Sequence, residues 1–463
     1  MFPRLPKSYH SYLPRIVGGL VLLSAVSLQA AADSVDLTPA VSTETHQVKV
    51  VYEVSGRLFS QSSGAQKPKQ HPLKAIGNFL YEERVLDQTT GRSIRYFEQA
   101  QSDFQVDGRS NSSQLRDESR WIVVDPNELE DMFVSPAGAL SRNELELIEF
   151  PGLSSLIERL LPQSEQKLND TWKHDDTLLA LLFNLDAVTV NDVQSELVKL
   201  EDETAYMTLK GSLIGTVKGV VTEVKLAGKY NFDVQSALIN WVAFSIEEQR
   251  EIGASTPGLN VKARLRMVRG SVKQPKHLHD QALTAFDLRS GVQGGLLEHV
   301  NDEAGYAVLH HRRWHVFSES PTVSVFRCVD DGRMLAQCNM AALPPISKKK
   351  PLTMHKFQQD ISMALGDSVT QIVDAKKSTN KQGQKVLRVV AAGTVDQAPI
   401  LWIYYHVTHK DGRRVACVFT MGATDVEQFG GEDLALTSSI RFLDLPADEF
   451  ADDSTAALDE TVR

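Results

Sequence analysis

The feature that most constrains the fold is a run of four amphipathic segments between residues 204 and 270. They read TAYMTLKGSLIGTV, VTEVKLAGKYNFDV, ALINWVAFSIEEQREI and LNVKARLRMVRG. Each alternates apolar and polar residues, which is the pattern of a β-strand with one buried face. Connections as short as Lys218-Gly219 and Gln235-Ser236 require neighbouring strands to run antiparallel. We therefore predict an antiparallel meander with one face in water and the other against a core.

The same pattern extends upstream, so we expect residues 33–270 to form one mainly antiparallel β domain. Alternating segments lie near residues 48–54, 93–104 and 120–124. Helical signals are few in this half. The clearest is an apolar stripe within residues 153–161, which Pro162 terminates.

A second domain is expected at residues 304–443, after a polar, glycine-containing connector at residues 271–303. Four strand-like segments precede a helix that begins after Thr353 as N-cap and ends at Gly366. Four further strands follow, and then a last helix from about Asp433 into Phe442. The predicted fold class is α+β, with a mainly antiparallel β domain followed by an α-β-α sandwich.

The two ends of the chain have different compositions from the domains. Residues 1–32 are expected to be an export signal: three Lys or Arg and no acidic residue accompany an apolar run at residues 16–28. Ala30-Ala31-Ala32 then offers a cleavage site before Asp33, and an uncleaved anchor is the alternative. Residues 444–463 hold seven Asp or Glu and one Arg, which predicts an acidic, disordered tail. We therefore expect an exported protein, periplasmic or extracellular, with no stable transmembrane span after signal cleavage.

The net charge of the chain limits the classes of partner that we expect. The formal net charge is -10, and removal of the three basic residues of the signal lowers it to -13. Non-specific nucleic-acid binding relies on basic contacts to phosphate, so we expect no nucleic-acid partner. The same net charge argues against electrostatic docking to anionic lipid.

Three cysteines follow the signal, and an odd number leaves at least one unpaired. Cys328 and Cys338 flank the turn at Asp331-Gly332. A two-residue loop puts their sulfurs on opposite faces, and a three-residue loop separates the residues by about 13 Å along the strand. Neither arrangement suits a disulfide. We expect both to be small buried residues, and a bridge from Cys417 to one of them stays open.

The C-terminal domain resembles the PsbP-like fold, an antiparallel sheet sandwiched by helices. The segments that carry the resemblance are WHVFSESPTVSVFRCVDDGRMLAQCNMAALPP, LTMHKFQQDISMALG, ILWIYYHVTHKDGRRVACVFTMG and FGGEDLALTSSIRFL, about a third of the chain. Members of that family bind protein partners, so the resemblance implies a non-enzymatic binding or assembly module. The N-terminal sheet is similar, in strand number and amphipathicity, to the half-barrels of envelope carriers of the LolA and LppX type. The whole chain is similar to uncharacterised exported bacterial proteins.

No residue pattern indicates catalysis, a cofactor or a metal. Histidines cluster in HHRRWH, YYHVTH and KHLHD. In the first two clusters the strand pattern points them to opposite faces, and arginines adjoin the first. His277 and His279 of the third share a side but lie in the expected connector. There is no nucleophile elbow or phosphate-binding loop. We therefore expect a non-enzyme without a cofactor. The one basic run, Lys348-Lys349-Lys350, is the candidate docking point for an acidic partner.

These observations predict an exported, non-catalytic envelope protein that acts as a protein-binding or assembly module, with another envelope protein as its partner. The alternative is a carrier that holds a lipid or other apolar ligand in the curved N-terminal sheet. An apolar concave face would favour the carrier, whereas a filled face together with a solvent-exposed patch on the C-terminal domain would favour the binding module. Polar groups that converge in a pocket would instead favour a third class, an envelope hydrolase.

Overall fold

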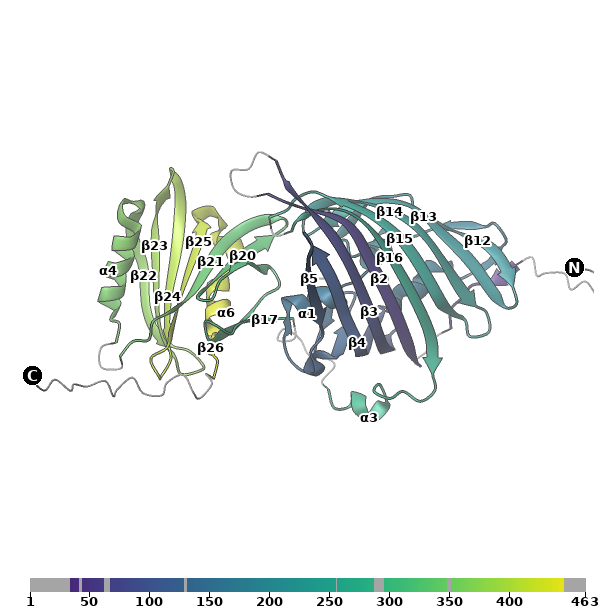
Figure 1. Cartoon of the computed structure of the whole chain (residues 1–463), viewed down its shortest axis with the longest axis horizontal. Coiled ribbons are helices and arrows are strands. Elements are labelled where there is room, and N and C mark those ends of the chain that lie inside the picture. Colours follow the sequence, from purple (N-terminus) through teal and green to yellow (C-terminus); the bar gives the residue numbers. More distant parts are fainter. Residues whose placement is uncertain are drawn as a thin grey trace, which may run out of the picture.

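The computed structural model describes residues 34–40, 44–61, 67–128, 131–254, 256–286, 295–347 and 351–444. They form two domains that lie side by side (Figure 1). The expected signal at residues 1–32, the run Lys348-Lys349-Lys350 and residues 445–463 of the expected tail lie outside the described residues. In the described part of the chain, no helix is both long and apolar enough to cross a bilayer.

The N-terminal domain is built on a sheet of 13 strands in the order β10-β12-β13-β14-β15-β16-β2-β3-β4-β6-β7, with β11 paired to β13 and β5 to β4. The long strands are β2 (Thr45–Ser60), β3 (Lys69–Asp87), β4 (Arg92–Val106), β13 (Thr204–Val217), β14 (Val220–Asp233), β15 (Leu238–Arg250) and β16 (Gly258–Val272). The shorter ones are β5 (Arg109–Gln114), β6 (Trp121–Val124), β7 (Phe133–Val134), β10 (Thr171–Lys173), β11 (Ala187–Asn191) and β12 (Gln194–Glu201). The predicted meander is confirmed as β13–β16, each strand paired antiparallel with the next.

The sheet is completed by a long-range pairing. β16 pairs antiparallel with β2 along its whole length, from Gly258 opposite Phe59 to Val272 opposite Thr45. This joins the meander to the β2–β4 strands, about two hundred residues earlier in the chain. Local alternation predicts each strand but carries no information on this partner, because many strands of similar length and polarity are available.

Three helical segments lie on the inner side of this curved sheet: α1 (Arg142–Ile148), η2 (Ser154–Leu160) and α2 (Asp176–Phe183). The helical segment that the apolar stripe at residues 153–161 predicted forms as η2, a 3-10 helix. α1 begins with a capping box in which the side chains of Ser141 and Glu144 each bond the other residue's backbone N–H. α2 begins at the cap Asp175 and ends at Asn184, which takes a left-handed conformation with φ 55°.

The N-terminal domain also holds a small two-stranded ribbon of β1 (Ser34–Asp36) and β9 (Glu165–Lys167).

The residues of the expected connector divide between the two domains. α3 (Asp280–Leu283) lies below the large sheet. The expected connector at residues 271–303 thus begins with the end of β16 and holds α3. It ends in β17 (Leu297–Asn301), which pairs with β18 (Tyr306–His310) of the C-terminal domain.

The C-terminal domain has a seven-stranded antiparallel sheet in the order β19-β20-β21-β25-β24-β23-β22. Its strands are β19 (Trp314–Glu319), β20 (Val323–Asp330), β21 (Arg333–Leu343), β22 (Val369–Thr379), β23 (Lys385–Val395), β24 (Ala398–Thr408) and β25 (Arg414–Gly422). α4 (Met354–Leu365) covers the side away from the N-terminal domain, as Figure 1 shows. The other side carries α5 (Val426–Phe429), α6 (Glu432–Ser438) and a small sheet in which β26 (Arg441–Phe442) joins β18.

This architecture confirms the α+β class. The predicted helix after Thr353 forms as expected: the Thr353 hydroxyl accepts from the Lys356 N–H, and Gly366 follows the last helical residue. The last helix is shorter than expected. Its chain continues into β26, because residues 441 and 442 pair with β18.

All three cysteines are free and buried. The register around Cys338 differs from both expected registers. A bulge between Cys328 and Val329 moves Cys338 opposite Phe326, so the side chains of Cys328 and Cys338 enter the same core. The expectation of opposite faces was wrong for this reason, whereas the expectation that Cys328 and Cys338 are small buried residues is confirmed. The bridge from Cys417 that the sequence left open is not formed.

Candidate binding surface

The concave side of the large sheet is filled by protein. One continuous apolar cluster joins the inner residues of the strands to α1, η2 and α2. Leu156, Ile157 and Leu160 of η2 are fully buried, and the rings of Phe79 and Phe150 stack with centroids 4.3 Å apart. The inner face is therefore packed as a core.

Buried charges fasten η2 to the sheet. Arg95 and Glu83 are each about 1% exposed, and the Arg95 Nε donates to a Glu83 oxygen at 2.7 Å. The Arg95 guanidinium also donates to the Ser154 hydroxyl at 3.1 Å. Burial opposes ionisation of Glu83, but Arg95 and Arg269 outweigh it and hold the pKa of this carboxyl below its ordinary value.

The outer face of the same sheet is strongly basic. Burial alternates along β2, β3 and β13–β16, so every second residue points to solvent. We define the basic face as the outward side chains of these six strands in the cross-strand rows between Lys49 and Arg57 of β2. Its basic members are Lys49, Arg57, Lys74, Lys210, Lys225, Lys229, Lys262, Arg264 and Arg266, and its acidic members are Glu53, Glu223 and Glu247.

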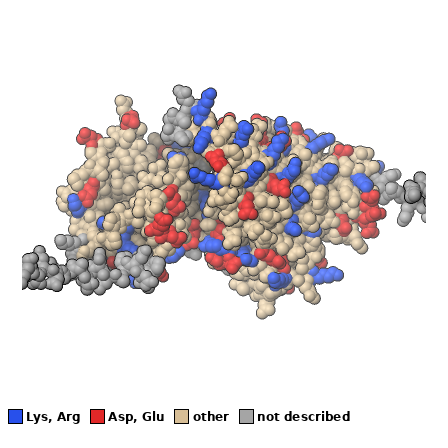
Figure 2. Space-filling model, in the orientation of Figure 1, with Lys and Arg blue, Asp and Glu red and all other residues tan. Residues whose placement is uncertain are grey.

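The basic face therefore carries nine positive and three negative groups in a chain whose net charge is -10. Figure 2 shows Lys and Arg side chains gathered over these strands. Two ion pairs lie within the face: Lys262 reaches Glu247 at 2.6 Å, and Arg266 reaches Glu53 at 3.7 Å. The hydrogen bond from Lys262 and the nearby charges of Lys262 and Lys225 lower the pKa of Glu247. The excess of basic groups gives this side of the domain a positive potential.

A groove of about 990 Å³ runs across one end of the basic face, where the β4–β5 hairpin rises beside β2, β3 and β16. Its charged lining is Lys74, Lys262, Arg264, Glu53, Asp103 and Glu247. Serine, asparagine and glutamine side chains from β2, β4, β5 and β15 supply the remaining polar groups. The groove thus offers hydrogen-bond donors and acceptors and charges of both signs.

A second hollow, of about 710 Å³, lies at the edge formed by β10 and α2. His174 lines it, and its Nε2 lies 2.8 Å from the Ser195 hydroxyl. Ser195 is fully buried, and burial lowers the pKa of His174 to about 4. A hydroxyl that solvent cannot reach is no accessible nucleophile, so we assign this pair a structural role.

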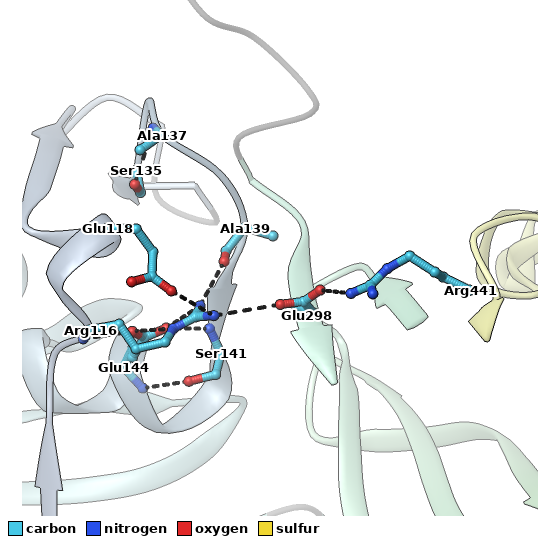
Figure 3. Close-up of polar contacts among 9 residues, drawn as sticks. All are labelled: Arg116, Glu118, Ser135, Ala137, Ala139, Ser141, Glu144, Glu298 and Arg441. Carbon is cyan, nitrogen blue, oxygen red and sulfur yellow. Dashed lines mark hydrogen bonds and ion pairs between the residues drawn. The ribbon is translucent and has the colours of Figure 1, made fainter. Parts of the chain in front are cut away.

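Charged side chains also join the two domains (Figure 3). Glu298 of β17 lies between Arg441 of the C-terminal domain at 2.9 Å and Arg116 of the N-terminal domain at 3.6 Å. Arg116 also holds Glu144, with a closest approach of 2.7 Å. Burial opposes ionisation of Glu144, but hydrogen bonds from Arg116 and from the Ser141 N–H keep its pKa below the ordinary value. The α1 cap and the domain junction therefore share one network.

Backbone contacts reinforce this junction. The short strand β8 (Leu140–Ser141) pairs in parallel with β17, which adds a piece of the N-terminal domain to the small C-terminal sheet. The Arg142 side chain donates to the Trp314 carbonyl at 3.0 Å. The turn at Gly219 meets the turn at Asp331 so closely that a Cβ on Gly219 would lie 2.5 Å from the Asp331 carbonyl carbon.

The residues that the sequence singled out have varied positions. Lys348-Lys349-Lys350 lies outside the described residues. Within the described residues no group of three or more His, Cys, Asp or Glu is placed to hold a metal ion. The histidines have other contacts: His311 bonds Glu432 at 2.6 Å, His409 bonds Asp411 at 2.9 Å, and His277 stacks on Tyr96.

The basic face was missed at the sequence level, although one strand carries its signal. In VKARLRMVR of β16, the outward positions 262, 264 and 266 are all basic. The argument from net charge concealed this asymmetry, because the acidic residues lie elsewhere. The negative net charge of the chain is therefore no argument against the docking of an anionic partner on this face.

Comparisons with known proteins give fold similarity only. No protein-family model matches the chain, and no curated protein matches it significantly. The cyanobacterial PsbP, CyanoP, from Synechocystis sp. PCC 6803 is 19% identical over 33% of this chain and 96% of its own, with a TM-score of 0.26. The Ran-binding protein Mog1p of Saccharomyces cerevisiae is 8% identical over 32% of this chain and 96% of its own, at 0.25. Lipovitellin is 7% identical over 50% of this chain and 26% of its own, at 0.28. The PsbP-like similarity is thus a weak one of fold, and these scores carry no argument about function.

Proposed function

We propose that this chain is an exported, non-catalytic protein of the cell envelope that works by binding another protein. The observation that supports this most is the filled inner face of the large sheet. An apolar carrier needs open space lined by apolar groups, whereas here η2, α1 and α2 occupy that side with buried apolar side chains. The lipid carrier, the alternative reading of the sequence, receives no support from this packing.

The arrangement of the domains also suits a binding module. The charged network at Glu298 and the β8–β17 pairing hold the domains against each other. A joined pair of sheets presents broad outer surfaces without needing to move, which lowers the entropy lost on binding a partner. The outer side of the N-terminal sheet, where every second residue of the long strands faces solvent, is such a surface.

The test is native mass spectrometry of the full-length protein, purified from the envelope of its own host after mild cross-linking. We expect a discrete complex with a second polypeptide and a mature chain that begins at Asp33. A mass that shows one bound lipid would contradict the proposal and establish the carrier. A bare chain from the envelope, or recovery of the protein only from the cytoplasmic fraction with residues 1–32 retained, would also overturn it.

A further inference from the structure

We infer that the basic face of the N-terminal sheet is the docking surface for an acidic protein. The inference rests on the proposed binding function and adds to it the surface and the chemistry of the partner. The first support is charge: nine basic groups against three acidic ones on a single face of an acidic chain. Opposite charge on a partner favours encounter and orientation.

The size of the face fits a protein partner. Six strands at about 4.8 Å spacing span roughly 24 Å, and the rise from residue 49 to residue 57 spans roughly 27 Å. The resulting area of roughly 650 Å² is close to the roughly 800 Å² that each partner buries in a standard protein–protein interface. The face is therefore large enough to account for most of one stable interface.

The pattern within the face favours a protein over other anions. Glu53 and Glu247 stand among the lysines and arginines and pair with Arg266 and Lys262. A folded acidic protein can place its own basic groups opposite these carboxylates, whereas a polymer of one charge sign cannot and binds through the excess of basic groups alone. The groove is hollowed and lined by serine, asparagine and glutamine side chains, which suits a protruding polar segment better than a planar membrane.

The experiment uses the full-length protein and two charge-matched variants. Lys225→Glu with Arg264→Glu changes the face, and Lys377→Glu with Lys410→Glu changes exposed lysines of the C-terminal domain by the same net charge. All four side chains are exposed, so we expect both variants to unfold at the urea concentration of the wild type. The probes are fluorescent poly-L-glutamate, poly-L-lysine as the sign control, a single-stranded oligonucleotide, and vesicles of phosphatidylcholine with phosphatidylglycerol.

We expect the wild type and the C-terminal variant to bind poly-L-glutamate at low salt, and the face variant to bind it at least tenfold more weakly. Raising salt from about 50 to about 300 mM should weaken binding, because screening acts on exposed charges. Tighter binding of the vesicles or the oligonucleotide through the same residues would overturn the inference. Equal loss in both variants, or no binding of poly-L-glutamate, would overturn it as well.

The natural partner provides the decisive comparison. The polypeptide found in the native mass spectrum should remain with the C-terminal variant and be lost from the face variant. If the face variant keeps that polypeptide, the proposed binding function stands and the docking surface is wrong. If the wild type carries no second polypeptide, the proposed function itself fails.

Discussion

The buried ion pair between Glu83 and Arg95 yields a sharp prediction about stability. Replacing Arg95 with Met keeps much of the side-chain volume but leaves the Glu83 carboxylate without its 2.7 Å partner inside the core. Removing one member of a buried pair costs about 3–5 kcal/mol, because the remaining charge stays desolvated. We expect Arg95→Met to lower the free energy of unfolding of the N-terminal domain by this amount at neutral pH.

The deficit should depend on pH. In the wild type the pKa of Glu83 is lower in the folded state than in the unfolded state, so its stabilisation is present above the unfolded pKa of about 4.5 and is lost as the pH falls through the folded pKa. In Arg95→Met, burial prevails and the folded pKa rises. The folded variant then binds a proton more readily than the unfolded chain. We therefore expect the difference from the wild type to shrink as the pH is lowered from 7 to about 5.

The assay is urea unfolding at both pH values for the wild type, Arg95→Met, Glu83→Gln and the double variant. Arg266→Met is the matched control, because Arg266 is 62% exposed and its ion pair with Glu53 is long, at 3.7 Å. We expect the control to lose less than about 1 kcal/mol. The double variant should lose less than the sum of the single ones. A loss under about 1 kcal/mol for Arg95→Met, or strictly additive losses, would refute the reasoning.

Three further predictions follow from the domain junction, the cysteines and the buried histidines. Gly219→Ala should loosen the domain junction, because Gly219 has φ 73° and a Cβ there would meet the Asp331 backbone. Small-angle X-ray scattering should then show a larger radius of gyration. Gly108→Ala is the control and should leave the radius of gyration unchanged, because Gly108 has a similar φ of 80° but open space around its Cβ position. Cys328, Cys338 and Cys417 should not react with a thiol reagent until urea unfolds the chain, since all are buried and burial raises the pKa of Cys328 to about 12; rapid labelling of the native protein would disprove this. Burial lowers the pKa of four histidines to about 4: His46, His174, His310 and His406. Between about pH 6.5 and pH 4 the unfolded chain therefore binds more protons than the folded one, and the free energy of unfolding should fall as the pH is lowered through that window. A urea midpoint that is the same at pH 7 and pH 5 would contradict this prediction.

Much of the local structure was predictable because the signals are local. The alternation in β13–β16 and the short turns between them predict the meander. Thr353 and Gly366 mark the ends of α4 by capping chemistry that involves only their neighbours. The order of elements in the C-terminal domain likewise follows from short apolar runs separated by turn residues.

The helices under the large sheet were harder to predict. α2 is apolar on nearly every side, as DTLLALLF, so it lacks the periodicity that identifies a surface helix. α1 carried a usable signal, since Ser141 and Glu144 form a capping box. The bulge that realigns Cys338 has no clear local mark, because a shift of one residue depends on how the whole strand packs.

By itself, the sequence determined the meander β13–β16, the alternation of buried and exposed residues along it, and where α4 begins and ends. These depend on periods of two and 3.6 residues and on capping side chains. Only the tertiary structure decided that the inner face of the sheet is filled and that its outer face is basic. The filled inner face depends on contacts such as Glu83 with Arg95, and the basic outer face depends on strand pairings such as β16 with β2. The physical reason is that a charged or apolar surface is a sum over strands distant in the chain, and packing chooses which of them become neighbours.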